Sequence, residues 1–445
     1  MKRKITQELI NWKQTAAGKS AALVVGARRV GKSYIVEQFA KENYKSYLII
    51  DFTRVSDEIK DLFYHQADDF DTFFTMLQTF YNTTFYHRDT VLVFDEIQAF
   101  PRARELIKHL VTDGRYDYIE TGSLMSIQKN VKDILIPSEE HKIELRPMDF
   151  EEFLWAIGEQ KAYENIAYLY EKKTPLGQAV HRKMMTLFRQ YLIVGGMPQA
   201  VQTFADTRDF KQVDIEKRHI LDLYRADIEK HGGRDAQKIR QVYDLIPTQL
   251  SHANKRFMFS AISDTARYRE YENALLWLRD ARIVNLCFNT TEPTVGLMAR
   301  MDVSAFKCYQ SDTGLLLSQT FSAKDLSREE IYKKLLFDKL EFNNGLIVEN
   351  VIAQMLVAAH HDLYYYAESE NRIEIDFLLT KTHLTSRKNI IPIEVKSGKK
   401  YLTNSLDKYR NEFSQQIEKS YVLHDGDIEV KDRIIYLPLY MAGLL

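Results

Sequence analysis

A glycine-rich segment near the start of the chain restricts the fold more than any other part of the sequence. Residues 26–33 read GARRVGKS, which fits the pattern G-x-x-x-x-G-K-[ST]. The apolar run 21–25 precedes it and predicts a buried strand, and residues 34–42 after it predict a helix. This order is typical of a phosphate-binding loop, and the strand and helix on either side make a chance match of the pattern a poor alternative.

The residue types in this loop suit a nucleoside triphosphate with magnesium. Gly26 and Gly31 let the backbone curl so that its N–H groups face the β-phosphate, and the start of the helix adds its positive dipole end. The Lys32 ammonium can reach the β- and γ-phosphates, and the Ser33 hydroxyl can bind Mg²⁺. We therefore expect ATP and Mg²⁺ to be held by Gly26, Arg28, Arg29, Val30, Gly31, Lys32 and Ser33.

A second apolar run ends in two acids. Residues 90–94 read TVLVF, and Asp95 and Glu96 follow. A buried parallel strand delivers the residues at its carboxyl end to the ligand crevice. Asp95 is expected to hold Mg²⁺ through water, and Glu96 to orient and polarise the attacking water. The alternative is an Asp-Glu turn that caps the next helix.

The next expected strand ends in Thr121-Gly122-Ser123. A hydroxyl here, of Thr121 or of Ser123, can contact the γ-phosphate or the attacking water, and a helix N-cap is an equally good interpretation of both. Hydrolysis between subunits, in a homo-oligomer built through the ATPase domain, also calls for an arginine finger. The sequence does not rank the candidates, which are Arg102, Arg104, Arg115 and Arg146.

Apolar runs and amphipathic stretches alternate in the first part of the chain. The runs predict a parallel sheet covered by helices on both faces. Residues 159–235 are predicted to be helical, with a break at the Gly-Gly-Met-Pro of positions 195–198. Three helices and a strand at 282–288 then suggest a winged helix-turn-helix. The expected domains are a P-loop core at 1–158, a helical lid at 159–235, a winged-helix-like domain at 236–327 and an α/β domain at 328–445.

Several motifs carry a family resemblance that covers nearly the whole chain. They are GARRVGKS, VLVFDEIQ, the TGS after the following strand, ELRPMDFEEFL, YLIVGGMPQAV, YRADIEK and YQSDTGLL. With them the chain resembles prokaryotic AAA+-class ATPases that carry a fused C-terminal domain of unknown function. The resemblance implies ATP hydrolysis with Mg²⁺. The loop ends in Ser33 where many relatives have Thr, which is a neutral difference.

Acids and a lysine recur in the last domain. Glu349 lies in an expected helix at 345–359, Asp376 on a strand at 373–379, and Glu394 and Lys396 on a strand at 390–396. The twofold period of a strand puts Glu394 and Lys396 on one face. The tripeptide E-x-K alone means little, because it also occurs at 140–142, 171–173 and 429–431.

This arrangement resembles that of the PD-(D/E)XK nucleases, which implies a restriction-endonuclease-like α/β fold. In that case Asp376 and Glu394 would bind Mg²⁺, Glu349 would add a metal contact, and Lys396 would position or help to deprotonate the attacking water. The alternatives are a strand with one solvated charged face, and an inactive domain that only binds.

Basic residues near the expected helix-turn-helix can approach DNA phosphates, or they can be the solvated charges of a scaffold. They are Lys255, Arg256, Arg267, Arg269, Arg279 and Arg282. The chain as a whole has no excess positive charge that would indicate a nucleic-acid partner, because its 61 Lys and Arg are balanced by 62 Asp and Glu. The sequence contains only two cysteines, Cys287 and Cys308, and neither belongs to a C-x-x-C pair. A zinc site or a disulfide framework is therefore not expected.

The N-terminal residues lack the apolar stretch of a signal peptide, and no apolar run approaches the ~20 residues that span a bilayer. We therefore expect a cytoplasmic protein with no membrane segment. The first functional hypothesis is an ATPase that couples ATP hydrolysis to a nuclease-like C-terminal domain acting on nucleic acid. The alternative is a nucleotide switch or signalling ATPase whose C-terminal domain binds without cutting. A kinase is a weaker third hypothesis, because Glu96 beside Asp95 suits water activation better.

Overall fold

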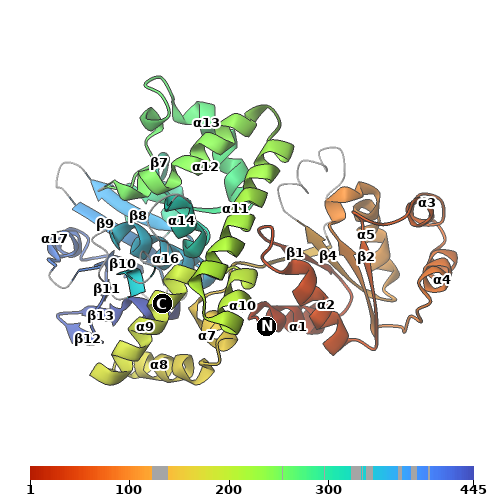
Figure 1. Cartoon of the computed structure of the whole chain (residues 1–445), viewed down its shortest axis with the longest axis horizontal. Coiled ribbons are helices and arrows are strands. Elements are labelled where there is room, and N and C mark those ends of the chain that lie inside the picture. The colour runs from red at the N-terminus through yellow and green to blue at the C-terminus, as the bar shows by residue number, and fades with distance from the viewer. Residues whose placement is uncertain are drawn as a thin grey trace. The chain divides into compact units, whose positions relative to one another are not determined.

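The structure, a computed structural model, describes residues 1–122, 139–252, 254–294, 296–321, 332, 334–336, 344–368, 373–381, 388–398 and 401–445. The chain divides into two compact units. The N-terminal unit comprises Met1–Arg146 and Asp280–Arg282, and the C-terminal unit comprises Pro147–Arg279 and Ile283–Leu445. Each unit is built around one β-sheet (Figure 1).

The sheet of the N-terminal unit is parallel throughout and has the strand order β2-β3-β4-β1-β5. Its strands are β1 (Ala21–Val25), β2 (Ser46–Asp51), β3 (Thr90–Asp95), β4 (Asp117–Gly122) and β5 (Glu140–Glu144). The apolar runs at 21–25, 46–50, 91–94 and 116–119 predict the first four strands, and the structure confirms them. The fifth was not predicted, because its sequence, EHKIE, contains one apolar residue in five.

Helices cover both faces of this sheet, as predicted. Helices α1 (Ile5–Ala16) and α2 (Lys32–Asn43) pack on one face, against the side chains at alternate positions of β1 and β3. Helices α3 (Asp57–His65), α4 (Phe70–Tyr81) and α5 (Pro101–Asp113) pack on the other face. There Phe63 contacts the rings of Phe52, Phe73, Phe94 and Phe100, which form an aromatic core.

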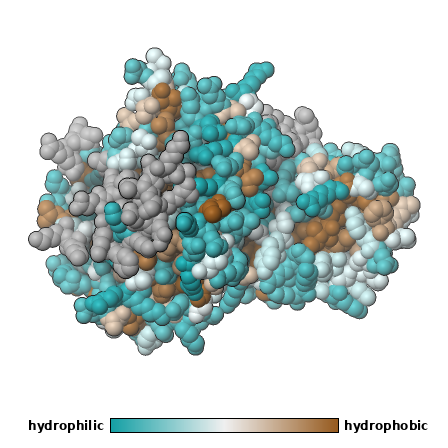
Figure 2. All heavy atoms as spheres, in the orientation of Figure 1, coloured by the Kyte–Doolittle hydropathy of each residue, from teal (hydrophilic) through white to brown (hydrophobic). Residues whose placement is uncertain are grey.

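The C-terminal unit combines many helices with a mixed sheet of the order β12-β13-β11-β10-β9-β8-β6-β7. Its helices are α7 (Phe150–Ala156), α8 (Gln160–Lys172), α9 (Gln178–Val194), α10 (Pro198–Thr207), α11 (Phe210–His231), α12 (Ala236–Ser251), α13 (Tyr268–Asp280), α14 (Thr313–Thr320), α16 (Asn344–Ala358) and α17 (Asn404–Glu412). Its strands are β6 (Val284–Thr290), β7 (Met301–Gln310), β8 (Tyr364–Glu368), β9 (Ile373–Thr380), β10 (Ile390–Val395), β11 (Ser420–His424), β12 (Glu429–Lys431) and β13 (Ile434–Pro438). The visible face of the molecule is mainly hydrophilic, with a hydrophobic area on the N-terminal unit (Figure 2).

The three domains expected after residue 158 pack together in this one unit. Strand β6 corresponds to the strand that the sequence suggested as part of a winged helix. It pairs with β7, and both strands continue the sheet of the last domain. Residue Phe288 on β6 is in register with Tyr364 on β8, and the two strands run parallel. Pairing covers an edge that a separate domain would leave open. The boundaries at 158, 235 and 327 stay predictions.

A buried carboxylate joins the helices to the sheet in this unit. Asp312 follows β7, and its Oδ2 accepts a hydrogen bond from the N–H of Gly196 at 2.5 Å, while Oδ1 accepts one from Leu315 at 2.9 Å. Gly196 lies between α9 and α10, and Leu315 lies in the first turn of α14. The carbonyl oxygen of Gly196 also accepts the N–H of Met148 at 2.7 Å. Asp312 therefore connects two segments that are far apart in the sequence, and Gly196 connects a third.

We expect Asp312→Ala to lower the free energy of unfolding by about 2–5 kcal/mol, because it leaves two buried N–H groups without an acceptor. The measurement is chemical denaturation of the full chain. Asp209→Ala is the matched control, because Asp209 caps α11 from an exposed position and accepts the N–H of Lys211. The control should cost about 1 kcal/mol. Equal losses in the two variants would contradict the role given to Asp312.

Candidate functional site

The glycine loop has the shape that the motif predicts. A Cβ at Gly26 would lie 2.2 Å from the carbonyl oxygen of Leu145, so no larger residue fits there. Arg29 and Gly31 have positive φ values of 66° and 95°, which turn the chain sharply before α2 begins at Lys32. The Lys32 ammonium lies within the loop, 3.1 Å from the carbonyl oxygens of Gly26 and of Ala27. Val30 is buried, whereas Arg28 and Arg29 are exposed.

Three of the predicted residues meet beside this loop. The Ser33 hydroxyl donates to Oδ1 of Asp95 at 3.0 Å, and the Thr121 hydroxyl donates to the same oxygen. Asp95 ends β3 and Thr121 lies near the end of β4, which is placed between β3 and the loop strand β1. The strand order therefore brings one acid and two hydroxyls to the carboxyl edge of the sheet. Ser123 lies outside the described residues.

Glu96 is held next to this group by a short turn. Its φ of 52° is in the left-handed region, and its N–H donates to the Thr121 hydroxyl oxygen at 3.3 Å. The side-chain amide of Gln98 donates to Oε2 of Glu96. Sequence reasoning assigned no role to Gln98. The signal was its place two residues after Glu96, which the turn Ile97–Ala99 brings back toward that carboxylate.

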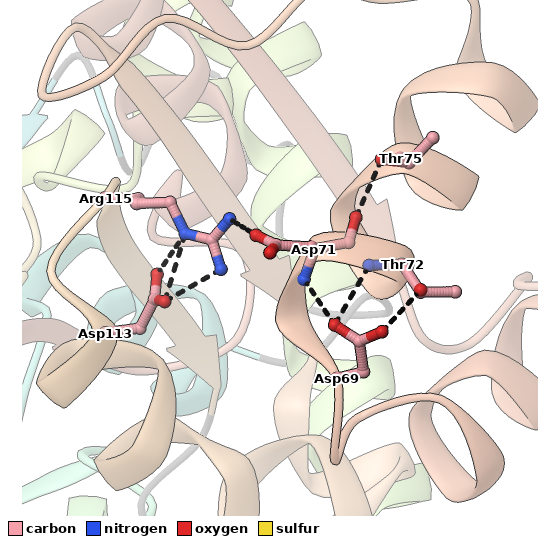
Figure 3. Close-up of polar contacts among 6 residues, drawn as sticks. All are labelled: Asp69, Asp71, Thr72, Thr75, Asp113 and Arg115. Atoms are coloured by element: carbon pink, nitrogen blue, oxygen red, sulfur yellow. Dashed lines mark hydrogen bonds and ion pairs between the residues drawn. The ribbon is translucent and has the colours of Figure 1, made fainter.

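Arg115, one of the four candidate arginine fingers, lies at the opposite edge of the sheet from the glycine loop. Arg115 precedes the amino end of β4, whereas the loop follows the carboxyl end of β1. Its guanidinium contacts Asp113 at 2.8 Å and Asp71 at 2.5 Å, and Asp71 lies in the first turn of α4, which Asp69 caps (Figure 3). These contacts tie α4 to the sheet, so Arg115 has a structural role.

The other three candidates differ in their surroundings. Arg104 is buried and its guanidinium makes two hydrogen bonds to Glu140, at 2.8 and 3.1 Å. Arg102 contacts Glu105 at 3.1 Å and is 30% exposed. Arg146 is 27% exposed. An arginine that reaches a neighbouring subunit has to be accessible, so Arg102 and Arg146 are better candidates than Arg104.

In the C-terminal unit, two of the predicted acids meet around a buried lysine. The ammonium of Lys307, on β7, lies 2.9 Å from Oε1 of Glu349, 3.1 Å from Oε1 of Glu374 and 3.9 Å from Oδ1 of Asp376. Lys307 is fully buried. A second ammonium, that of Lys255, contacts the other oxygen of Glu349. We call these five residues the lysine–carboxylate cluster. Sequence reasoning missed Lys307, because nothing near it marks it as a partner of Glu349.

The two lysines set the charge of the cluster. Burial opposes ionisation of Glu349, but the ion pairs with Lys307 and Lys255 outweigh burial and lower the pKa of this carboxyl to about 2. Burial and the neighbouring charge of Glu349 raise the pKa of Asp376 to about 7. Burial also opposes the charge of Lys307, but the surrounding carboxylates raise the pKa of its ammonium well above the usual value. Glu349 is therefore an anion that the protein itself neutralises.

The remaining predicted residues lie on the adjoining strand. Strands β9 and β10 are antiparallel, and Oδ2 of Asp376 accepts the N–H of Val395 at 2.8 Å. Lys396 contacts Oε1 of Glu394 at 2.5 Å, in agreement with their expected place on one face. Across the described parts of the chain, no three His, Cys, Asp or Glu side chains are grouped to hold a metal ion. Metal binding by Glu349, Asp376 and Glu394 stays a prediction, and the structure offers Lys307 as a cation instead.

Some of the basic residues expected to approach DNA have partners within the protein. Lys255 pairs with the buried Glu349. The guanidinium of Arg267 donates to the carbonyl oxygens of Asp264 and Ala266, both at 3.0 Å. These contacts give two of the six cations structural partners.

Among the helices that the structure describes, none is long and apolar enough to cross a membrane.

Three family models match separate parts of the chain. Residues 18–154 match a model described as AAA domain, residues 185–325 match a domain of unknown function (DUF8612), and residues 344–441 match another (DUF4143). The first match covers the glycine loop, Asp95, Glu96 and Thr121, which the parallel sheet brings together. Most of the N-terminal unit therefore matches an AAA domain. No curated protein matches the chain.

Solved structures match the chain only at low similarity. The Walker-type ATPase PABY2304 of Pyrococcus abyssi is 11% identical, with a TM-score of 0.41, over 72% of this chain and 96% of that one. The RuvB Holliday junction branch migration motor of Thermotoga maritima is 12% identical, with a TM-score of 0.30, over 64% and 89%. The Orc1 protein of Aeropyrum pernix in complex with DNA is 11% identical, with a TM-score of 0.28, over 76% and 93%. Nothing about the substrate or partners of this chain follows from values this low.

We expect Thr121→Val to lower the rate of ATP turnover about tenfold, because it removes one hydrogen bond to Asp95 and the acceptor for the Glu96 N–H. Nucleotide affinity should change much less, since the loop is intact. Steady-state hydrolysis and equilibrium binding measure the two effects. Thr121→Ser keeps the hydroxyl and is the control. Failure of the serine variant to restore turnover would show that the methyl group, not the hydroxyl, matters.

We expect Lys307→Met to lower the free energy of unfolding by about 3–5 kcal/mol at neutral pH, because it leaves buried carboxylates with too few cations. The loss should shrink as the pH falls, since the unpaired acids can then fold in their protonated form. Denaturation at several pH values between 4.5 and 8 measures this. The double variant Lys307→Met with Glu349→Gln removes the stranded charge and should recover part of the loss. A loss that does not depend on pH would contradict the account.

Proposed function

We propose that this protein binds ATP with Mg²⁺ in the N-terminal unit and hydrolyses it. The observation that carries the proposal is the contact of Ser33 and Thr121 with Asp95 beside the glycine loop. Ser33 and Asp95 supply oxygen ligands of the kind that Mg²⁺ prefers, at the place where the β- and γ-phosphates would meet the loop. Bound Mg²⁺ would neutralise charge that develops on the phosphates. Lys32 would exchange its contacts with the loop carbonyls for phosphate oxygens.

Glu96 is the proposed general base for the attacking water. Its backbone N–H is fixed to Thr121 and its carboxylate accepts the amide of Gln98, so its carboxylate orientation is defined. The Thr121 hydroxyl links Glu96 to Asp95, and so it links the base to the residue that would hold the metal. Ser123 is a proposed alternative to Thr121 as the hydroxyl near the γ-phosphate or the attacking water. An arginine finger from Arg102 or Arg146 of a second copy is a proposed addition that depends on assembly through this unit.

We expect Glu96→Gln to reduce ATP turnover at least about 100-fold and to leave nucleotide binding within a few-fold of the wild type, because the amide cannot take a proton. Lys32→Ala should instead weaken binding itself. Turnover assays and calorimetry with ATP and Mg²⁺ separate these effects. The control is Glu37→Gln, which changes an exposed acid of α2 that pairs with Lys41. Full turnover by the Glu96 variant would refute the assignment of the base.

For the C-terminal unit we propose a role in binding rather than in phosphodiester cleavage. The observation that favours this role is the lysine–carboxylate cluster, in which Lys307 supplies the positive charge that a metal would bring to Glu349 and Asp376. Cleavage coupled to ATP, with Asp376, Glu394 and Lys396 as its residues, is the second candidate. The hydrogen bond between Asp376 and the backbone beside Glu394 supports it. Action on nucleic acid and a cytoplasmic location are further proposals.

One assay decides between these two candidates. Wild-type protein is incubated with Mg²⁺ or Mn²⁺ and ATP on single- and double-stranded DNA and RNA, beside Lys396→Ala. We expect the wild type to cleave no more nucleic acid than Lys396→Ala does, because lysines already neutralise the acids of this region. Metal-dependent cleavage that is lost in both Lys396→Ala and Asp376→Ala would establish the nuclease instead.

A further inference from the structure

A cavity in the C-terminal unit lies where parallel strands end. Strands β10, β11 and β13 run parallel to one another, so their carboxyl ends share one edge of the sheet. Gly398 follows β10, His424 ends β11, and Asp425 and Gly426 follow it. These residues and the facing side of α9 line a cavity of about 440 Å³. Its volume is in the range of small-molecule sites. The carboxyl edge of parallel strands is also where α/β proteins bind ligands.

The charges that line this cavity favour an anion. Helix α9 contributes Arg182 and Arg189, which are seven residues apart and therefore on one side of the helix. One acid, Asp425, also lines the cavity. Two guanidinium groups against one carboxylate leave a positive charge, and guanidinium groups match the oxygens of a phosphate better than any other side chain.

Hydrogen bonds hold the walls in place. His181 Nε2 lies 2.9 Å from the carbonyl oxygen of Asp425, which can only accept, so Nδ1 accepts from the Tyr440 hydroxyl at 2.9 Å. His424 is fixed in the same way, between the carbonyl oxygen of Asp427 at 3.1 Å and the Tyr401 hydroxyl at 2.7 Å. A ligand therefore meets two histidines and a tyrosine that are already ordered, which lowers the entropy cost of binding.

The same loop is tied to the start of α9. The Asp427 carboxylate accepts the N–H groups of Leu176 and Gly177, at 3.0 and 2.8 Å. Gly426 lies so close to the imidazole of His424 that an added Cβ would come within 2.5 Å of it. Glycine at 398 and 426 also lets a ligand approach the backbone closely. The loop after β11 and the arginine-bearing helix therefore form one fixed site.

We propose that this cavity binds the phosphate group of a phosphomonoester of about nucleotide size, with Arg182 and Arg189 as its phosphate ligands. Tyr401 and Met185 offer an aromatic and an apolar surface to the organic part of the ligand. Such a phosphate can belong to a free nucleotide or to the 5′ end of an oligonucleotide. The proposal adds a ligand to the binding role of the C-terminal unit and does not depend on ATP hydrolysis.

The test uses the full chain carrying Lys32→Ala, so that the glycine loop does not contribute to phosphate binding. Calorimetry measures the binding of AMP, of a tetranucleotide with a 5′-phosphate and of the same tetranucleotide with a 5′-hydroxyl. We expect the phosphorylated probes to bind, and we expect Arg182→Ala or Arg189→Ala to weaken that binding by about tenfold or more. Preference for AMP or for the phosphorylated tetranucleotide identifies the source of the phosphate, and either preference supports the site.

Lys183→Ala is the matched control. Lys183 is the neighbour of Arg182 on α9, but it pairs with Glu159 at 2.7 Å and does not line the cavity. Its loss should leave the affinity within about twofold, because exposed charges act weakly at a distance. An equal effect of Lys183→Ala and Arg182→Ala, equal binding of the 5′-hydroxyl probe, or no binding of any probe at millimolar concentration would overturn the proposal. Thermal unfolding of each variant shows that it is folded, and Arg182 is exposed enough to be replaced without loss of the fold.

Discussion

The contact between Asp312 and the Gly195-Gly196 turn determines how the C-terminal unit is put together. An added Cβ at Gly195 would lie 2.3 Å from Asp312 Oδ1, one at Gly196 would lie 2.0 Å from the carbonyl oxygen of Met148, and one at Gly314 would lie 2.4 Å from that of Val194. Backbone thus packs directly on backbone, with a buried carboxylate as the acceptor. The motifs YLIVGGMPQAV and YQSDTGLL therefore pack directly against each other. Their contacts hold helices and sheet together.

The N-terminal unit could be predicted in detail because its chemistry is local in the sequence. Eight consecutive residues make the loop, Asp95 follows a run of apolar residues, and Thr121 ends the next expected strand. The rule that parallel strands share their carboxyl edge then brings these residues together without knowledge of the order of the strands. Strand β5 was not predicted because it lies at the edge of the sheet, where its residues are largely exposed and do not form an apolar run. The contact of Gln98 with Glu96 was not predicted because it depends on a positive φ at Glu96, which cannot be read from the sequence.

The C-terminal unit resisted prediction because its important pairings are long-range. The acids were found by their place on a helix and two strands, and the structure confirms these three elements. Their cations come from elsewhere: Lys307 is separated from Glu349 by 42 residues, and no spacing rule connects them. In the same way, β6 can pair within a hairpin or with β8, and it does both. Local sequence shows which residues form strands, whereas the partners of a strand depend on the whole unit.

The partners of each acid explain why two similar sets of carboxylates differ in what they can bind. Asp95 accepts hydrogen bonds from Ser33 and Thr121, whose hydroxyls are neutral, so its negative charge is still available to a cation. Glu349 has two ammonium groups as its partners, and a divalent cation would have to displace at least one of them from a buried position. Stranding a buried ammonium costs several kcal/mol, about as much as breaking a buried ion pair. Residue type alone makes both acids candidate metal ligands, and only the charge of their neighbours separates them.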